Sequence, residues 1–348
     1  MSMALNARTI VILLVLGALA LVPPVAGAMD EPFYVSLFTR MLVLAIAASS
    51  LNLVLGYGGL VSFGHAAYLG LGAYVVGIGF YHAANGGMDW ALNGWMHLAL
   101  SILIPGLAAL LIGAISLRTR GVYFIMITLA FSQMLYFIFI GLEKYGGDDG
   151  LSLWYLSDFS PLMDLNDDSQ LYYFAFVVLL VVLALTHRIV NSRFGMVLRG
   201  AKSNERRLQA IGFPTYRYRL VAFGISGAFC GVAGFLMANQ SEFVSTAEMH
   251  WVHSGDLIVM VVLGGMGTLF GPLLGAVTFL MMEQYLPVIL SGLCGLGGGE
   301  SCDIAGEYWK MVFGPILVLV VLFARGGVDG LLRGQFGRSQ GAGEAGHG

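Results

Sequence analysis

This chain of 348 residues contains long apolar blocks, and few ionisable side chains lie inside them. Those few are the residues with which the blocks could do chemistry. They include Arg40, His65, Asp256 and Glu283. An ionisable group deep in apolar surroundings is costly, so each is a candidate functional residue. We expect Arg40 and Asp256 to lie near the ends of their blocks, where a charge stays hydrated. For His65 and Glu283, a deep position and a hydrated one both stay open.

Motifs for phosphate, metal or nucleophile chemistry are missing from the sequence. A Walker A motif holds phosphates with a lysine that follows glycine, and none of the three lysines, Lys144, Lys202 and Lys310, does so. His-Glu-x-x-His and Gly-x-Ser-x-Gly do not occur, and no two of the three cysteines form a Cys-x-x-Cys pair. We therefore predict no enzyme, no catalytic residue, no metal site and no cofactor bound by this chain.

The composition predicts an all-α, polytopic transmembrane bundle. Hydrophobic residues make up 58% of the chain and charged residues 11%, whereas soluble domains carry about 25% charged residues. A helix needs ~20 apolar residues to cross ~30 Å of hydrocarbon, and it satisfies its own backbone hydrogen bonds in lipid. The apolar blocks are Ile10–Ala28, Phe33–Leu55, Leu60–Tyr81, Trp95–Leu117, Val122–Leu142, Leu171–His187, Leu220–Ala238, Leu257–Leu290 and Trp309–Phe323.

The first block has two interpretations. Its length, and Pro23-Pro24 followed by Asp30-Glu31, favour a retained membrane helix. Ala26-Gly27-Ala28 would also fit the cleavage site of a signal peptide. At the other end of the chain, the Gly-rich polar residues 337–348 predict a flexible tail. Residues 1–336 then form one predicted transmembrane domain.

Lysines and arginines of the connections predict the orientation, because they are enriched on the cytoplasmic side. The connection from Arg188 to Arg219 carries eight basic residues and one acid, Glu205. The turn with Arg118 and Arg120 and the C-terminal tail are basic as well, whereas residues 143–168 hold seven acids and one lysine. We predict a loop outside the cytoplasm at 143–168 and both termini inside.

These sides set the parity of the last crossings. The helix that ends near Ala238 leaves the basic side and the tail returns to it, so Leu257–Leu290 must contain an even number of crossings before the final helix. Gly264-Gly265-Met266-Gly267 and Gly271-Pro272 interrupt this block, and Gly and Pro are natural break points. We predict two short membrane segments that meet at this break, and about ten membrane segments in all. A re-entrant pair fits the parity equally well.

A second interruption is expected near Gly56–Gly59, at the start of the glycine-rich stretch Gly56–Tyr74. Unwound backbone lines solute paths in transporters, and tight helix packing is the alternative explanation of so many glycines. The candidate path residues are Gly58, Gly59, Ser62, His65, Gly264 and Gly265. A different glycine set shares one helix face at spacings of three and four, which predicts a packing surface. It consists of Gly224, Gly227, Gly231 and Gly234.

The basic connection, about residues 191–218, contains a predicted short helix outside the membrane. Ser203 fits an N-cap and Gly212 a C′ residue, and Pro214 prevents continuation. Leu208 and Ile211 lie on one side of this helix. Such a helix could dock into a groove of a partner protein or lie on anionic lipid headgroups, and both interpretations stay open.

These segments resemble the permease subunit of ATP-binding-cassette (ABC) importers for branched-chain amino acids. The matching motifs lie in Gly58–Ala67, Leu117–Ala130, Ser192–Gly212 and Val261–Pro272. Together they are specific, and the resemblance covers roughly residues 33–325. It places Glu205, Arg206, Ala210 and Gly212 at a coupling helix that docks the ATPase.

The resemblance implies a transport subunit of the bacterial inner (plasma) membrane without ATPase activity of its own. Its expected partners are a second permease, two ABC ATPase subunits that bind the ATP, a periplasmic solute-binding protein and membrane lipid, but no nucleic acid. Urea and short-amide permeases of the same family are the alternative. An ion-driven secondary transporter is a further alternative, against which the few and dispersed ionisable residues argue.

The loop of residues 291–302 is predicted to lie outside the cytoplasm, and it contains Cys294 and Cys302. Disulfides persist in the periplasm, and the glycines of the loop let the two Cα atoms approach within the ~4.4–6.8 Å of a bridge. We predict a disulfide between them, with two free thiols as the alternative. Cys230 lies inside an apolar block, and we expect a reduced, buried thiol there.

Overall fold

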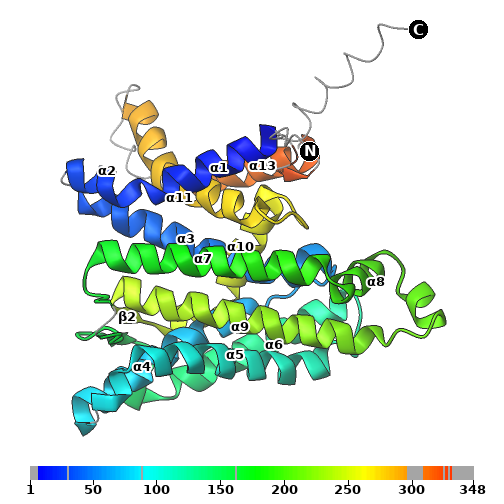
Figure 1. Ribbon diagram of the computed structural model, residues 1–348, viewed down its shortest axis with the longest axis horizontal. Helices are drawn as coiled ribbons and strands as arrows, with labels where there is room; N and C mark the ends of the chain where they lie inside the picture. The colour runs from blue at the N-terminus through cyan, green and yellow to red at the C-terminus, as the bar shows by residue number, and fades with distance from the viewer. Residues whose placement is uncertain are drawn as a thin grey trace, which may run out of the picture.

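Long helices run side by side along the long axis of the molecule (Figure 1). This computed structural model describes residues 7–29, 31–87, 89–160, 163–295, 309–323, 326–327 and 330. The helices are α1 (Ala7–Ala20), α2 (Val22–Met29), α3 (Pro32–Asn52), α4 (His65–Gly86), α5 (Gly94–Ser116), α6 (Val122–Ile140), α7 (Asp168–Asn191), α8 (Arg193–Ala210), α9 (Thr215–Ser241), α10 (Trp251–Gly264), α11 (Gly271–Gly295) and α13 (Trp309–Phe323).

Short elements connect these helices. A single π-helical turn, η1 (Leu53–Tyr57), continues α3, and the 3₁₀ turns are η2 (Asp89–Leu92), η3 (Glu143–Tyr145) and η4 (Thr246–Met249). The strands β1 (Leu151–Ser152) and β2 (Phe243–Val244) pair antiparallel, with Leu151 opposite Val244. The acidic loop before α7 is therefore held against the end of α9.

Local side-chain chemistry determines where several helices begin. Asn93 caps α5 by accepting hydrogen bonds from the backbone N–H groups of Trp95 (3.0 Å) and Met96 (3.3 Å). Asp167 caps α7 by accepting one from Ser169 (2.9 Å). These bonds satisfy backbone donors that the first helical turn leaves without partners.

Seven helices of the described residues are long and apolar enough to cross a membrane, and these spans start at residues 32, 65, 94, 122, 168, 215 and 271. Shorter apolar helices occupy Trp251–Gly264 and Lys310–Leu319. The predicted all-α polytopic bundle with broken helices is therefore confirmed. The first apolar block forms two helices, α1 and α2, because Pro23 and Pro24 fall in the first turn of α2.

The glycine face of α9 packs where it was predicted to pack, directly against neighbouring backbone. A Cβ on Gly234 would overlap the carbonyl oxygen of Leu69 in α4, and a Cβ on Gly231 would overlap that of Ser101 in α5. Gly72 of α4 lies equally close to the carbonyl of Gly231. Small residues permit this approach of helix backbones, and it places α9 in the centre of the bundle with α4 and α5 on one side.

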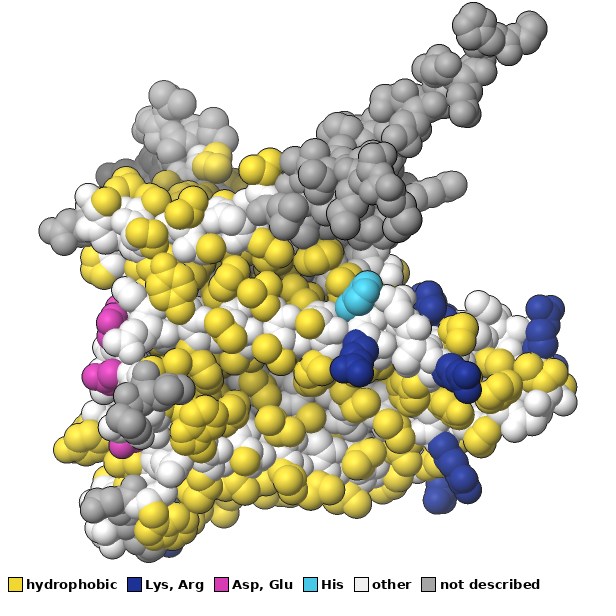
Figure 2. Space-filling view, viewed as in Figure 1, with side chains coloured by type: hydrophobic (Ala, Val, Ile, Leu, Met, Phe, Trp, Pro, Cys, Tyr) yellow, Lys and Arg dark blue, Asp and Glu magenta, His cyan; other side chains and the backbone are white. Residues whose placement is uncertain are grey.

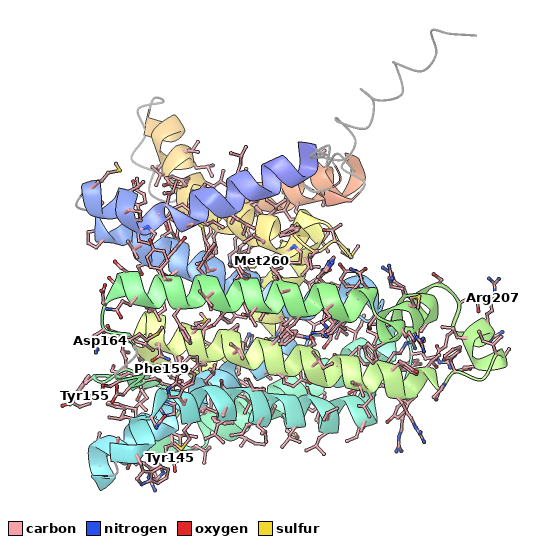
Figure 3. The ribbon with its side chains drawn as sticks, viewed as in Figure 1. Tyr145, Tyr155, Phe159, Asp164, Arg207 and Met260 are labelled. Carbon is pink, nitrogen blue, oxygen red and sulfur yellow. The ribbon has the colours of Figure 1, made fainter. Side chains whose placement is uncertain are left out.

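Charge separates along the long axis of the molecule. Figure 2 shows lysine and arginine side chains gathered at the end where α8 lies, and acidic side chains at the opposite end, with an apolar surface between them. Asp164 and Arg207 mark these two ends (Figure 3). At the acidic end, the hydrogen bonds that Asp164 accepts from the backbone and side chain of Asn166 lower the pKa of its carboxyl.

Candidate functional site

The first predicted helix break is present. After the π turn Leu53–Tyr57 the chain is non-helical until α4 begins at His65, and Gly59 has a φ of 70°. Ser254 of α10 stabilises this segment, because its hydroxyl donates to the carbonyl of Phe63 (2.8 Å) and accepts from the N–H of Ala66 (2.9 Å). The freed backbone groups of the break are thus satisfied by a neighbouring helix, as membrane-buried backbone requires.

The second predicted break is present as well. Helix α10 ends at Gly264 and α11 begins at Gly271, and Gly265 and Gly267 have φ values of 121° and 75°, which favour glycine. The Thr268 hydroxyl donates to the carbonyl of Gly265 (2.9 Å) and accepts from the N–H of Gly271 (3.0 Å). One threonine side chain thereby stabilises the turn between the two helices.

Asn52 joins the two breaks. Its side-chain amide donates to the carbonyl of Thr268 (2.8 Å), and its Oδ1 accepts from the N–H of Gly267 (2.9 Å). The two breaks also meet through backbone, since a Cβ on Gly56 would lie 2.5 Å from the nitrogen of Gly267. Asn52 is 1% exposed, so loss of its amide would leave two partly buried backbone groups of the second break without partners.

Lys202 of α8 connects the basic end of the molecule to the first break. Its Nζ donates a 2.7 Å hydrogen bond to the carbonyl of Gly56, in the π turn. A Cβ on Gly59 would lie 2.8 Å from Cγ of the same lysine, so the side chain lies along the break. From the sequence, Lys202 counts only as one basic residue of the 188–219 connection, and no local pattern indicates its contact with Gly56.

Glu205 lies in the second half of α8, and its carboxylate contacts α9 and the turn before α6. Its Oε2 lies 3.0 Å from Nη1 of Arg219 in α9, and both side chains are mostly buried. Its Oε1 accepts from the Thr215 hydroxyl (3.2 Å) and lies 3.6 Å from Nη2 of Arg120. Of the four predicted docking residues, Arg206, Ala210 and Gly212 are exposed and Glu205 is not. Glu205 thus positions α8, and docking of the ATPase by all four residues stays a prediction.

The ends of the predicted coupling helix differ slightly from expectation. Helix α8 is kinked at Asn204, which has φ −157° and ψ 94° and accepts from the N–H of Arg207 (3.0 Å). The predicted N-cap at Ser203 is therefore wrong by one residue, because Asn204 caps the second half of α8. Gly212 is confirmed as C′: its φ is 90°, and Phe213 N–H donates to the Leu208 carbonyl (3.1 Å) as in a Schellman motif.

His65 is fully buried at the start of α4, within a chain of neutral hydrogen bonds. The Ser226 hydroxyl donates its one hydrogen to the carbonyl of Ser50 (2.6 Å) and lies 2.8 Å from Nε2 of His65, so Nε2–H donates a hydrogen bond to the Ser226 oxygen. The thiol of Cys230 donates to the His65 carbonyl (3.2 Å), and Cys230 is the reduced, buried cysteine that was predicted. Ser62 is also fully buried. Both path candidates thus lie within the packed interior, and a role in the path stays a prediction.

The ionisable residues that are dispersed in the sequence gather in space. Arg40, Asp256 and Glu283 line one pocket of about 270 Å³, together with Glu248, His253 and Lys310. Dispersal was therefore a wrong inference from sequence spacing, because α3, α10 and α11 pack together. In the part of the chain that the structure describes, no group of three His, Cys, Asp or Glu could hold a metal ion.

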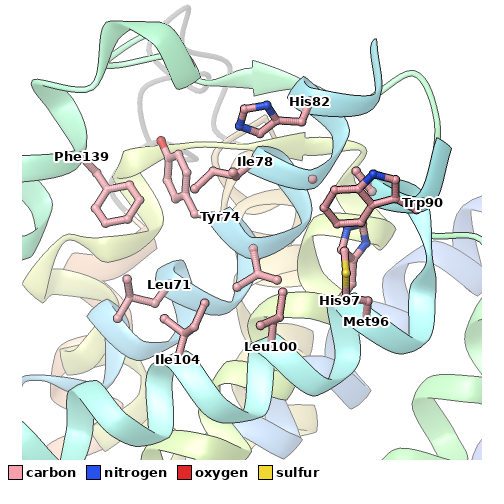
Figure 4. A pocket seen from close by; sticks show the side chains of 13 residues that line it. Leu71, Tyr74, Ile78, His82, Trp90, Met96, His97, Leu100, Ile104 and Phe139 are labelled. Atoms are coloured by element: carbon pink, nitrogen blue, oxygen red, sulfur yellow. The ribbon is translucent and has the colours of Figure 1, made fainter. Parts of the chain in front are cut away.

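A larger cavity between α4 and α5 has a different character. It encloses about 420 Å³, and its walls are aromatic and aliphatic except for His82 and His97 (Figure 4). Nδ1 of His97 is 2.8 Å from the Ser157 hydroxyl, which holds the acidic loop against α5. A cavity so apolar suits hydrocarbon better than a charged solute.

The predicted disulfide cannot be placed, because Cys302 and the side chain of Cys294 lie outside the described residues.

Comparison with known proteins identifies the family. Residues 33–321 match the family described as branched-chain amino acid transport system / permease component, and the chain belongs to this family. It is a multi-pass membrane protein of the permease class. No solved structure matches the chain.

Individual proteins that the chain resembles are also named as permeases of branched-chain amino acid transport systems. The chain is 26% identical to the high-affinity branched-chain amino acid transport system permease protein LivM of Escherichia coli (strain K12), over 90% of this chain and 75% of that protein. It is 25% identical to a probable LivM of Methanocaldococcus jannaschii, over 81% and 89% of the two chains. A probable LivH of the same archaeon matches 43% of each chain at 27% identity.

Proposed function

We propose that this chain is a permease subunit of an ABC importer that moves branched-chain amino acids across the bacterial inner membrane. The relatives named for branched-chain amino acid transport support the solute class. The main support for coupling between an ATPase and the solute path is one hydrogen bond of 2.7 Å. It joins Lys202 of the basic helix α8 to the carbonyl of Gly56 at the first helix break. The urea and short-amide alternative is not favoured by these relatives.

The proposed partners follow from this role. LivM and LivH relatives both match, which supports pairing with a second permease. Two ATPase subunits bind and hydrolyse ATP, a periplasmic binding protein delivers the solute, and lipid surrounds the bundle. This chain supplies no ATPase activity, cofactor or nucleic-acid contact of its own.

The proposed orientation puts the basic end in the cytoplasm. The separation of basic and acidic side chains in Figure 2 supports it through the positive-inside rule. The dark-blue start of α1 and the red end of α13 lie toward the end that carries α8 (Figure 1), which supports cytoplasmic termini.

The proposed mechanism transmits ATPase motion by direct contacts. Closure of the ATPase dimer shifts α8 through its exposed residues Arg206, Ala210 and Gly212. Glu205 keeps α8 attached to α9, while Lys202 pulls on the π turn of the first break. Asn52 passes the displacement to the second break, so that both breaks change together and the solute path opens on one side or the other.

An ion-driven secondary transporter remains the competing class, and it is no longer opposed by dispersal of charged residues. Family membership opposes it instead. The deciding experiment reconstitutes the chain with its second permease, its ATPases and binding protein in liposomes, and measures leucine and urea uptake with active and with inactivated ATPase. Leucine uptake that requires hydrolysis supports the proposal. Uptake driven by a proton or sodium gradient without ATP refutes it.

A matched pair of variants tests the coupling part of the proposal. Glu205→Arg would place a third arginine beside Arg120 and Arg219 and should detach α8 from α9, so uptake should fall while the chain stays in the membrane. Glu143→Arg changes the same residue type in the acidic loop at the opposite end and should leave uptake unchanged. Equal uptake in both variants would remove α8 from the mechanism.

A further inference from the structure

We propose that the charged pocket among α3, α10 and α11 is a transient binding site for the zwitterion of an apolar amino acid, an inference that rests on the proposed function. The pocket encloses about 270 Å³. Its lining residues are Arg40, Leu44, Ala66, Leu69, Met237, Glu248, Val252, His253, Asp256, Leu257, Met260, Phe279, Glu283 and Lys310.

Charges of both signs stand opposite each other across this pocket. Nη2 of Arg40 lies 3.9 Å from Oε1 of Glu283, and Nδ1 of His253 lies 3.9 Å from Oδ2 of Asp256. Charge-assisted hydrogen bonds are shorter, about 2.7–2.9 Å. These pairs are therefore loose, and their side chains are only about one-third to one-half exposed. A guanidinium and a carboxylate held this far apart can each still bond to a ligand.

This arrangement fits a zwitterion better than other small solutes. A ligand carboxylate can bond to Arg40 while the ammonium two bonds away bonds to Glu283 or Asp256. A ligand with only a carboxylate could bond to Arg40 but would bring a further negative charge beside Glu248, Asp256 and Glu283. A ligand with only a positive charge would add no bond to the guanidinium of Arg40. Neutral urea would gain little from either charge.

The other walls of the pocket are apolar. Leu44, Leu69, Leu257, Met260 and Phe279 contribute them, and all but Leu44 are buried. Met260 of α10, labelled in Figure 3, is 1% exposed. Small-molecule sites combine such walls with a few polar groups that fix orientation. A branched aliphatic side chain would lie against them while its backbone charges meet the ionic groups.

The pocket is also connected to the breaks. Helix α3, which carries Arg40, leads into the first break, and α10 and α11, which carry Asp256 and Glu283, flank the second. Displacement of the breaks would therefore change the distance between the groups that hold the two ends of the zwitterion. A site of this kind holds the solute in one state and releases it in the other.

The test measures leucine binding separately from coupling. Saturation-transfer NMR of the solubilised complete importer, without binding protein, detects leucine on the wild type and on Arg40→Gln and Glu283→Gln. Arg188→Gln and Glu143→Gln, exposed at the two ends, are the matched controls. Leucinamide, which lacks the carboxylate, and 4-methylpentanoate, which lacks the ammonium, are the competitors.

We expect the leucine signal and leucine uptake to fall at least about tenfold in both pocket variants and to stay within about twofold in both controls. Each competitor should displace leucine from the wild type only weakly, because it satisfies one charge. ATPase stimulation by liganded binding protein should persist. If a single variant does not accumulate in the membrane, the charge-swapped pair Arg40→Glu/Glu283→Arg takes its place, and recovered leucine binding supports the proposal.

Wild-type leucine signals in both pocket variants would overturn the proposal, as would equal displacement by leucinamide and leucine. Loss of ATPase stimulation together with uptake in folded variants would also overturn it, because the pocket would then serve coupling. Failure of the proposed function looks different: the wild type itself would import urea but no leucine, or would import leucine without ATP hydrolysis.

Discussion

The contact between Lys202 and Gly56 allows the sharpest test of coupling. Lys202→Met removes the ammonium that donates the 2.7 Å bond and keeps a stem of similar length beside Gly59. A hydrogen bond to a charged group contributes about 1.5–3 kcal/mol when it is shielded. The lysine is an exposed residue, so water replaces part of the lost bond, and we take about 1–2 kcal/mol as the loss. That is roughly a 5- to 30-fold change in an equilibrium.

We therefore expect the leucine imported per ATP hydrolysed to fall roughly 5- to 30-fold in Lys202→Met, while ATP hydrolysis itself continues. The assay measures both rates in the same proteoliposomes. Lys202→Arg keeps a charged donor and should retain most of the ratio, and Lys144→Met, at the acidic end, should retain all of it. A wild-type ratio in Lys202→Met would refute the transmission of motion through the first break.

Three further outcomes are expected. Asn52→Leu leaves two backbone groups of the second break unpaired and should destabilise the folded chain by about 2–4 kcal/mol, seen as a lower Tm in detergent, whereas exposed Asn85→Leu should not. Gly212→Val strains a residue at φ 90° in open space by about 1–2 kcal/mol, so ATPase co-purification should drop. Co-purification equal to that of Gly87→Val, which strains a glycine at φ 60° in open space after α4, would count against docking here. Non-reducing digestion and mass spectrometry should find the Cys294–Cys302 bridge, and free thiols in protein prepared without reductant would exclude it.

The positions of the helix breaks could be read from the sequence because glycine and proline act locally. Gly264 to Pro272 interrupts an apolar block in the sequence, and the chain turns there in the structure. The αL conformation of Gly212 was predictable for the same reason, since Pro214 follows closely. A one-residue error at Ser203 arose because Asn204, equally able to cap a helix, stands beside it.

The partners of the site residues could not be read in this way. Asn52 bonds to a segment 215–216 positions away, and no local pattern specifies that pairing. One signal in the sequence nevertheless marked Asn52 as a residue that needs hydrogen-bond partners. Its side chain is a polar amide inside an apolar block that is long enough, at ~20 residues, to span a membrane. Likewise, Arg40, Asp256 and Glu283 come together only because three helices pack, which spacing along the chain does not reveal.

Glycine contacts between backbones fasten four helices of the bundle in two pairs. Gly72 and Gly234 fasten α4 to α9, and in the same manner a Cβ on Gly264 would overlap the carbonyl of Gly271 and one on Gly275 that of Met260, which fastens α10 to α11. Backbones in direct contact have no intervening side chains that could change rotamer. We therefore expect relative motion between the α4–α9 pair and the α10–α11 pair rather than within either one, and the charged pocket, which residues of both pairs line, would change shape with it.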